Sequence, residues 1–585
     1  MLRKIFKQML VAQILSAMTV MICMLVDSLM IGRFLGVDSM TAYGLASPVL
    51  LIFAAFGSML TAGIQVICGK TMGSGDREAT NAVYSASVMI ALVISAVGVL
   101  LVLAFATPIC GLLGAGKPTP DNEVFTLTRD YLRGFIVGAP AFILAQICVP
   151  FLQISGNRSR LAIAVIAMTI ADIVFDALNV FVFNGGTLGM GLASSLSYVA
   201  AIAIGGSYFL KKDCMFKFRP RSVSRRLCGE LFRAGIPTVI NQLSLVLLVF
   251  ALNKILLEVG QNAAVAAYSV ISTVGNLCYC FGSGVASVAL LLSSIFYSDE
   301  DKTALRELMK TMCRYSALLV LAVTAVVLLA APYLIRLFLQ GDPDAVAMAT
   351  EGLRLFSLSL LPCAFNTSLK NYYQGVNRTR FTEAISVMQN FTFTALFAFL
   401  LSRFWKTTGV WLGFVCGETL TLLIIFAVVW IREKRIVLSA DAFALLPKDF
   451  GVSERDCLER SIVSMEEATI ASQQAAAFCA EHGDTSKTGM QIALCIEEMV
   501  SNIILHGFTK DKREHSVELR LICKEDKTHV IRIRDNCVNF DPLKYLELHK
   551  TDDPIAHIGI RMVMKTVKSA TYVNSLGLNN LTLVL

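Results

Sequence analysis

The sequence predicts a polytopic α-helical membrane protein with twelve transmembrane helices in two six-helix repeats, followed by a C-terminal α+β sandwich domain. Three observations lead to this fold class. The 585 residues are 55% hydrophobic and only 16% charged, with a mean hydropathy of +0.66, which is typical of membrane proteins. The long apolar runs stop near residue 431, after which charged and apolar residues alternate as in soluble domains. The first half of the membrane part also resembles the second.

Twelve segments are long and apolar enough to span a bilayer, which takes about 20 apolar residues per helix. Their centres lie near Met21, Phe56, Leu92, Phe142, Ile170, Ala200, Leu245, Val285, Val323, Leu360, Phe393 and Ile425. The first run is long and is followed by many similar ones, so we interpret it as a retained span rather than a cleaved signal peptide. An even number of spans puts both termini on one side.

Lysine and arginine gather on alternate loops. These clusters include Arg3 and Lys4, Lys70 and Arg77, Arg158 and Arg160, Lys302 and Arg306, Arg378 and Arg380, and Arg432 and Lys434. The positive-inside rule makes this face cytoplasmic, so we expect a multi-pass plasma membrane protein with both termini in the cytoplasm. The same clusters account for the net charge of +8 without a nucleic-acid partner. The 16 cysteines form no C-x-x-C pair and have no metal-ligand spacing with histidine, which predicts small, reduced core residues.

An internal repeat divides the membrane part. A shift of 225 residues lays Tyr43 on Tyr268 and Asp76 on Asp301, and a shift of 220 lays "GNRSR" on "VNRTR". Secondary transporters use such repeats to build a site between two halves and to alternate its access. The predicted units are a first half (1–220), a second half (221–435), a linker (436–455) and a C-terminal domain (456–585).

Four polar residues within the spans suggest an ion site. Asp27 lies in the middle of the first span, where a carboxylate is costly unless it is functional or paired; the alternative is a wetted helix end. On the fifth span Asp172 and Asp176 are four residues apart and Asn179 is one turn further, so the three face one side. This set favours a cation or proton site. The position aligned with Asp27 in the second half is Leu252, so we expect the site in the first half only.

The motifs "VDSLMIGRFLG...AYGLASP", "GKTMGSGD", "QISGNRSR" and "DIVFDALNVFVF" occur in that order. Together they resemble the multidrug and toxic compound extrusion (MATE) family over residues 1 to about 431. The resemblance implies export of drug-like or cationic organic compounds in exchange for H⁺ or Na⁺, with Asp27 and Asp176 coupling the cation or proton. Asp172 stands where family members commonly carry Asn. Our hypothesis is that one carboxylate takes up a proton from outside and thereby releases a cationic substrate.

The C-terminal domain carries a polar stripe on its second predicted helix, where Glu498, Asn502 and His506 are spaced by four residues. Glu498 suits a general base, and Asn502 offers an oxygen to Mg²⁺, which needs few protein ligands. The strand "VIRIRD" puts Asp535 on the same face as its isoleucines, where it can accept a hydrogen bond from an adenine amino group. We therefore expect ATP and Mg²⁺ as cofactors.

The motifs "EEMVSN", "RDNCVNFDP", "HIGIRMV" and "YVNSLGLNNLTL" resemble the histidine-kinase-like ATPase superfamily, most closely its anti-sigma-factor serine-kinase branch. The resemblance implies that Glu498 is the catalytic base, that Asn502 holds magnesium and that Asp535 reads adenine. It also implies that Gly559 opens a phosphate-binding helix terminus and that Asp541 is a further cofactor-binding residue. A serine kinase of this type needs a small regulatory protein as its partner.

Two departures from this pattern lead to alternatives. Cys537 replaces a glycine, and Ala556–His557 replace a Gly-Gly pair that lets the backbone approach the phosphates. Nucleotide binding then survives with weaker turnover, or the domain is a regulatory module that no longer binds nucleotide. The leading hypothesis is an exporter regulated by its cytoplasmic domain. The alternative is a membrane-anchored signalling protein with a transporter-like sensor and a kinase-like output.

Overall fold

The computed structural model describes residues 2–74, 76–113, 115, 117, 119, 122–211, 214–338, 343–434, 440–447, 450–510, 514–524, 526–548 and 558–585. The membrane part begins with α1 (Leu2–Met30), η1 (Ile31–Leu35), α2 (Val37–Gly73), α3 (Arg77–Ala104), α4 (Ala106–Leu112), α5 (Glu123–Val137), α6 (Ala139–Ile154), α7 (Arg158–Leu178), η2 (Asn179–Phe183) and α8 (Gly186–Gly206). It continues with η3 (Pro220–Ser222), α9 (Arg225–Ser298), α10 (Lys302–Phe338), α11 (Pro343–Gly375), α12 (Thr379–Val387), η4 (Met388–Thr392), α13 (Phe393–Glu433) and α14 (Ala440–Phe443).

The described helices agree with twelve membrane spans. Eleven of them are long and apolar enough to cross a bilayer, and the bent pair α5–α6 adds a further candidate. One of the eleven, Ser486–Gly507, belongs to the C-terminal domain and is not a span. The stretch Thr379–Arg432, by contrast, has 54 residues and a break at Trp405 and Lys406, so it holds two spans. The predicted fold class is confirmed.

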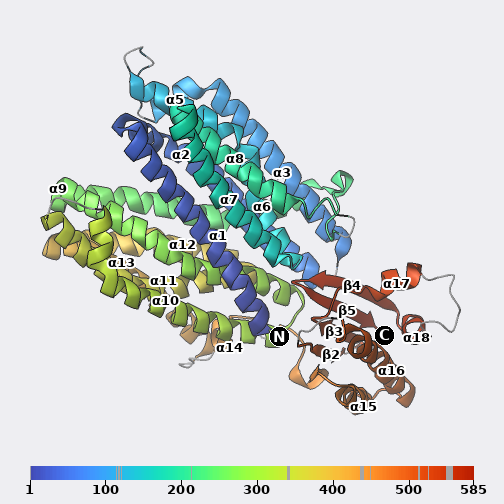
Figure 1. Ribbon diagram of the computed structural model, residues 1–585. Coiled ribbons are helices and arrows are strands. Elements are labelled where there is room, and N and C mark those ends of the chain that lie inside the picture. Colours follow the sequence, from blue (N-terminus) through green and yellow to red (C-terminus); the bar gives the residue numbers. More distant parts are fainter. Residues whose placement is uncertain are drawn as a thin grey trace.

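The membrane helices form two bundles that diverge away from the C-terminal domain (Figure 1). The bundles are α1–α8, and α9–α13. Near the C-terminal domain α2 and α9 pack closely, because small residues let their backbones approach. A Cβ atom on Gly63 would lie 2.5 Å from the Leu231 carbonyl oxygen, and the Ser294 hydroxyl donates to the Gln65 carbonyl oxygen at 2.7 Å. These contacts join the two bundles at this end.

Asp76 and Asp301, which the repeat aligns, each cap the start of a helix. Asp76 accepts a hydrogen bond from the Ala79 amide at the start of α3, and Asp301 accepts one from the Ala304 amide at the start of α10, both at 2.9 Å. A side-chain oxygen at a helix start satisfies an amide that has no partner within the helix. The sequence repeat therefore coincides with a shared way of starting the helix after each loop.

The C-terminal domain is a five-stranded antiparallel sheet in the order β1-β2-β3-β5-β4. Its elements are η5 (Glu454–Asp456), β1 (Cys457–Ile462), α15 (Met465–Glu481), α16 (Ser486–Asn502), η6 (Ile503–Gly507), β2 (Val517–Cys523), β3 (His529–Asp535), α17 (Pro542–Leu548), α18 (Ile558–Thr566), β4 (Ser569–Ser575) and β5 (Leu578–Val584). Helices α15, α16 and α18 contribute with the sheet to one apolar core, which includes Ala475, Ile496, Ile531 and Val563.

The predicted strand that ends at Asp535 is β3, and the predicted helix with Glu498 and Asn502 is α16. The π turn η6 starts directly after Asn502, so the four-residue spacing that linked His506 to the polar stripe does not extend through this segment. Along β2 and β3 apolar residues face the helices, whereas Arg520, Arg532 and Arg534 face the opposite side. This second face is turned toward the membrane part (Figure 1).

Candidate functional site

Three of the predicted ion-site residues come together between α1 and α7. Asp27, Asp172 and Asp176 are buried, and each has a carboxylate oxygen within 4.8 Å of the others. Asp172 and Asp176 share a face of α7 because they are four residues apart, and α1 packs against α7 and brings Asp27 to them. The two predicted segments thus form a single site of three carboxyl groups.

Most oxygens of this site lack a partner. In the described part of the chain, Oδ1 of Asp27, Oδ2 of Asp172 and both side-chain oxygens of Asp176 are buried without a hydrogen bond. A buried polar atom without a partner costs about 1–3 kcal/mol, and three neighbouring negative charges repel one another. A bound cation or shared protons would remove both costs. The carboxylate oxygens are also suitable ligands for a hard cation.

Asn179 lies next to this set but is used differently. Its Nδ2 donates to the Gly186 carbonyl oxygen at 3.0 Å, and its Oδ1 is in close contact with Gly189. The side chain therefore fastens α7 and η2 to α8. Its part in ion coupling stays a prediction, and the geometry favours the three carboxyl groups.

A polar cluster in the second bundle was missed by the sequence interpretation. Lys370, which is fully buried between helices, donates to Asn241 at 2.5 Å and to Gln389 at 3.2 Å. Gln389 in turn donates to Glu418 at 3.3 Å, and Asn366 donates to Glu418 at 2.8 Å. The sequence feature that could have predicted this cluster was an ionisable residue within an apolar span, because such a residue costs free energy unless it has a partner. The second bundle thus holds a lysine and a glutamate bridged by an amide.

The predicted nucleotide site is built around α16. Glu498 and Asn502 lie one turn apart, and the Asn502 side-chain amide donates to the Glu498 carbonyl oxygen at 2.7 Å, which leaves Oδ1 of Asn502 for a ligand. Gly559 in the first turn of α18 is in close contact with the Glu498 carboxylate, and a side chain there would collide with it. Asn502 Oδ1 is thus the atom that would hold Mg²⁺, and the roles of Glu498 and Gly559 stay predictions. Ala556–His557 lie outside the described residues.

Asp535 ends β3 in a buried polar network. Its Oδ1 accepts hydrogen bonds from the Asn579 side chain at 2.8 Å and from the Cys537 amide at 2.9 Å. Burial raises the pKa of the Asp535 carboxyl, and these two bonds oppose the shift. The Cys537 side chain also interacts with this carboxyl group and likewise opposes the shift, so the role of Asp535 in adenine binding stays a prediction. Cys537 is buried, and its sulfur would lie 3.0 Å from a Cβ atom on Gly507, so the thiol fills the space beside that glycine.

Asp541, another predicted cofactor residue, makes different contacts. Its Oδ1 accepts from the backbone amides of Leu543 and Lys544 at the start of α17, and its Oδ2 pairs with Arg77 at 2.8 Å. The Arg77 guanidinium also lies 5.5 Å from the ring centre of Tyr572. Arg77 begins α3, so Asp541 connects the C-terminal domain with the membrane part. Its role in nucleotide binding remains a prediction.

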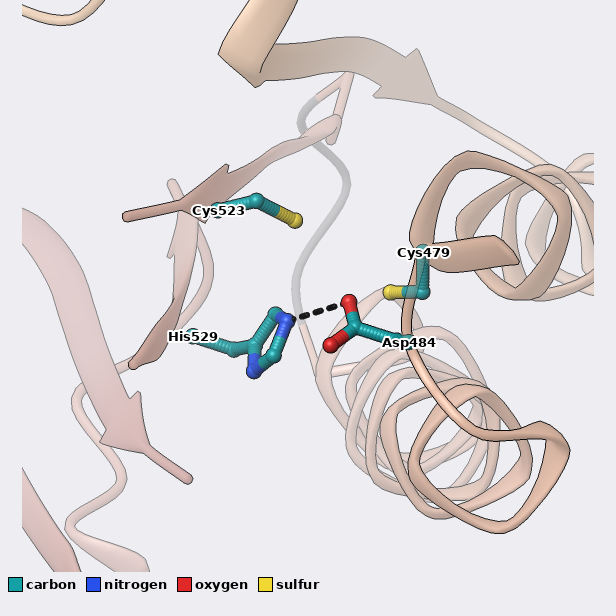
Figure 2. A group of neighbouring side chains, drawn as sticks. All are labelled: Cys479, Asp484, Cys523 and His529. Carbon is teal, nitrogen blue, oxygen red and sulfur yellow. Dashed lines mark hydrogen bonds and ion pairs between the residues drawn. The ribbon is translucent and has the colours of Figure 1, made fainter. Parts of the chain in front are cut away.

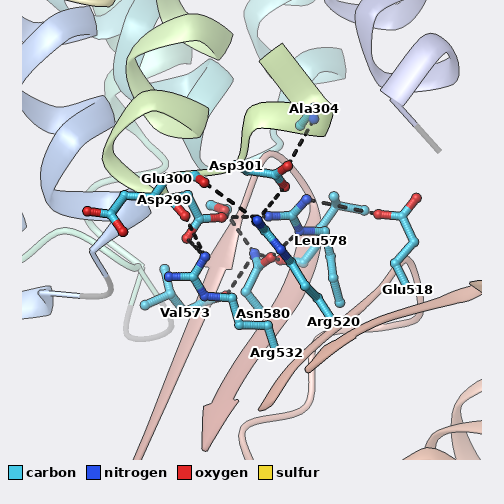
Figure 3. Close-up of polar contacts among 12 residues, drawn as sticks. Asp299, Glu300, Asp301, Ala304, Glu518, Arg520, Arg532, Val573, Leu578 and Asn580 are labelled. Carbon is cyan, nitrogen blue, oxygen red and sulfur yellow. Dashed lines mark hydrogen bonds and ion pairs between the residues drawn. The ribbon is translucent and has the colours of Figure 1, made fainter. Parts of the chain in front are cut away.

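A second connection is formed by acidic residues between α9 and α10 and by the arginines of the sheet. Figure 3 shows the Asp299 and Asp301 side chains and the Glu300 backbone carbonyl facing these arginines, whereas the Glu300 side chain is exposed. Asp299 pairs with Arg532 at 2.9 Å and with Arg534 at 3.0 Å. Burial raises the pKa of Asp299, and the two arginines oppose the shift. These ion pairs are largely shielded from water, where charge interactions are stronger than at an open surface.

Further contacts with the sheet domain come from both bundles. Asp301 pairs with Arg520 at 3.3 Å on the side of the second bundle. On the side of the first bundle, the Leu576 amide donates to the Ile154 carbonyl oxygen at 2.6 Å. A cavity of about 310 Å³ lies between the domain and the membrane helices, lined by residues such as Met72, Leu292 and Val573. The domain therefore bridges the loops of the two bundles.

Two helical bundles with buried carboxyl groups and an appended sheet domain define a multi-pass membrane protein of the transporter type. The MatE family model matches residues 12–178 and 237–400, and a model named "Histidine kinase-like ATPase domain" matches residues 464–585. The chain therefore belongs to the MatE family and carries a C-terminal histidine-kinase-like ATPase domain. The resemblances to the MATE family and to the histidine-kinase-like ATPase superfamily are confirmed.

Individual relatives agree with this assignment. Multidrug export protein MepA of Staphylococcus aureus (strain bovine RF122 / ET3-1) is 22% identical over 399 residues, covering 68% of this chain and 86% of MepA. MepA of Staphylococcus saprophyticus is 23% identical over 407 residues, covering 69% and 88%. A crystal structure of MATE in complex with MaL6 has a TM-score of 0.68 at 21% identity, covering 74% of this chain and 96% of that one. The structure titled as the outward-facing conformation of a multidrug resistance MATE family transporter has the same TM-score at 20% identity, with the same coverage.

Proposed function

We propose that the chain is a secondary active antiporter that exports drug-like or cationic organic compounds in exchange for H⁺ or Na⁺. The observation that carries the proposal is the cluster of Asp27, Asp172 and Asp176, with four buried oxygens that have no hydrogen-bond partner in the described chain. A transporter needs such a site because the binding and release of a cation change the net charge of the carboxyl cluster. A purely sensory membrane part has little use for three buried carboxyl groups.

Uptake of the coupling ion is linked to export because the coupling ion and the organic cation compete for the same negative charge. When the three carboxyl groups hold protons or a metal cation, their repulsion is relieved and their attraction for an organic cation is lost. Uptake of the coupling ion from outside then favours release of the exported cation, and loss of the ion to the cytoplasm restores affinity. MepA relatives are named as multidrug export proteins, which supports the export of drug-like compounds.

Alternating access is proposed to occur between the halves 1–220 and 221–435. The α2–α9 contacts at Gly63 and Ser294 lie at the end where the C-terminal domain docks, and the bundles diverge at the other end (Figure 1). We take the docked end as cytoplasmic, because the basic loops lie there and ATP is available there. Substrate release to the outside then requires this closed cytoplasmic end, and substrate loading requires it to open.

We further propose that nucleotide binding to the C-terminal domain regulates this cycle. The domain contacts Ile154 and Arg77 on the first bundle and Asp299 on the second, so a rocking motion of the bundles must strain or break some of these contacts. Two hydrogen bonds lead from Asp535 through Asn579 to Tyr572, whose ring faces Arg77. Adenine bound at Asp535 would therefore affect Tyr572, which contacts Arg77 of the membrane part. The same site is compatible with phosphorylation of a small partner protein, in which Glu498 would act as the general base.

Transport is tested with purified protein in liposomes that contain a fluorescent organic cation. An imposed proton or sodium gradient is expected to drive dye movement against its own gradient, and dissipation of that gradient with an ionophore should stop it. A rate equal to that of protein-free liposomes under both gradients would refute antiport. Dye movement that needs ATP but no ion gradient would instead indicate ATP-driven transport.

A further inference from the structure

Four metal-ligating side chains meet at one end of the C-terminal domain, far apart in the sequence. Cys479 comes from the last turn of α15, Asp484 from the turn after it, Cys523 from the end of β2 and His529 from the start of β3. One ligand atom of each lies within 4.8 Å of the others (Figure 2). Figure 2 shows the two sulfur atoms on either side of the imidazole–carboxylate pair. None of these residues takes part in the sites described above.

The backbone holds all four positions. The Asp484 amide donates to the Cys479 carbonyl oxygen at 3.1 Å, and Gly483 between them adopts a φ of 76°, so the chain turns sharply at the end of α15. Cys523 and His529 are direct partners across β2 and β3, so their side chains leave the same face of the sheet. Two ligands are thus fixed by a helix end and two by a hairpin.

The donor set and its burial match zinc. Zinc is bound in tetrahedral sites by cysteine at about 2.3 Å and by histidine or carboxylate at about 2.0–2.2 Å, which requires ligand atoms about 3.3–3.8 Å apart. Imidazole Nε2 of His529 is 2.7 Å from a carboxylate oxygen of Asp484, so this pair would separate by roughly half an ångström to admit the ion. The Asp484 and His529 side chains are only 8% and 3% exposed, and both cysteines are buried.

A neighbouring histidine does not belong to this set. Nδ1 of His482 is 2.8 Å from the Phe478 carbonyl oxygen, and its Nε2 is 3.3 Å from Asp456. Both ring nitrogens therefore have other partners. The site also lies away from the nucleotide pocket, because His529 and Asp535 are at opposite ends of β3, about 20 Å apart along a seven-residue strand.

We propose that Cys479, Asp484, Cys523 and His529 bind a structural Zn²⁺ ion. The two thiols release their protons to solvent as the ion binds, and His529 coordinates as neutral imidazole. The bound ion joins the end of α15 to the β2–β3 hairpin and so fastens the helical layer to the sheet. Four protein ligands fill the tetrahedral shell and leave no position for a catalytic water. Because zinc binds the folded domain, it stabilises that domain by mass action.

The test uses full-length protein purified in detergent, with any histidine tag removed. Metal content measured by mass spectrometry is expected to be about one zinc per chain, and Co²⁺ replacement should give the thiolate charge-transfer and tetrahedral d–d absorption bands. Cys479→Ser, Cys523→Ser and His529→Gln should each weaken zinc binding by roughly 10-fold or more in a chelator competition. The matched control is Cys495→Ser, because Cys495 is equally buried in the same domain but outside the cluster.

Thermal unfolding provides a second readout. A chelator should lower the unfolding temperature of the wild type and of Cys495→Ser, and should leave that of Cys479→Ser unchanged. Wild-type protein that holds no zinc after incubation with Zn²⁺ would overturn the proposal. Zinc binding by the cluster variants equal to that of the wild type, or a Cys479–Cys523 disulfide found by mass spectrometry in protein prepared under reducing conditions, would also overturn it.

Discussion

Replacement of Asp27 or Asp176 with Asn is expected to reduce gradient-driven dye transport at least roughly tenfold. Each substitution keeps the size of the side chain but removes a group that can exchange a proton or bind a cation. In the structure both carboxyl groups belong to one buried cluster with Asp172, and their oxygens have few other partners. Loss of either group should therefore affect the coupled step rather than folding. The measurement is initial dye flux in liposomes under an imposed ion gradient.

The matched control is Asp38→Asn, since Asp38 is exposed at the start of α2 and lies outside the cluster. This variant should transport like the wild type. Thermal unfolding in detergent should show that Asp27→Asn and Asp176→Asn are folded, because removal of a buried charge tends to stabilise a protein. If both variants transported at the wild-type rate, the carboxyl cluster would not be the coupling site.

Replacement of Asp535 with Asn is expected to weaken ATP binding by roughly 10- to 150-fold. This factor corresponds to the loss of one hydrogen bond to a charged group, about 1.5–3 kcal/mol. Calorimetric titration of segment 440–585, which contains its own apolar core, with ATP in the presence and absence of Mg²⁺ is the direct measurement. We expect magnesium-dependent binding by the wild type. Absence of binding by the wild type would mean that the domain has lost its nucleotide site and serves for docking.

The same titration has a pH dependence. Burial raises the pKa of Asp535, so the carboxyl group takes up a proton at a higher pH than an exposed aspartate does. The protonated group is a weaker hydrogen-bond acceptor for the adenine amino group than the carboxylate is. ATP binding is therefore expected to weaken as the pH falls toward the raised pKa of Asp535, before an exposed aspartate would take up a proton. Asp535→Asn should lack this dependence.

Glu498 provides a comparison within the same site. Glu498→Ala is expected to bind ATP like the wild type but to lose phosphoryl transfer, because the substitution removes the proposed base and leaves Asn502 in place. Glu497→Ala, a change of the neighbouring exposed residue, serves as its control. Equal phosphoryl transfer by the wild type and Glu498→Ala would refute the role of Glu498 as base.

Several features were predictable because local sequence determines them. The twelve spans follow from the length and composition of apolar runs, and the shared face of Asp172 and Asp176 follows from helical spacing. Asp27 could be added because an unpaired carboxylate within a span is costly. The distance between α1 and α7 could not be predicted, because it depends on how the bundle packs.

Other features depend on tertiary contacts that spacing does not reveal. Lys370, Gln389 and Glu418 lie on separate helical segments, and the π turn η4 that carries Gln389 was not predicted. The pairing of Arg532 with Asp299 joins residues more than 200 positions apart and was not predicted. The cysteines of the proposed zinc site have no short spacing, because a helix end and a hairpin bring them together.

We expect nucleotide in the C-terminal domain to control transport through the contacts between this domain and the two bundles. This control is tested most directly by the dye flux of the full-length protein with and without Mg-ATP on the side of that domain. The decisive variant is Asp299→Lys, which replaces the partner of Arg532 and Arg534 with a like charge. Glu300→Lys is the control, since it makes the same charge change at the neighbouring exposed side chain.

Mg-ATP is expected to change the flux of the wild type and of Glu300→Lys. Asp299→Lys is expected to transport under the same ion gradient but no longer to respond to the nucleotide. A wild-type flux that is identical with and without Mg-ATP, in protein that binds ATP by calorimetry, would contradict the proposed regulation. An Asp299→Lys variant that responds to ATP as fully as the wild type would contradict it as well.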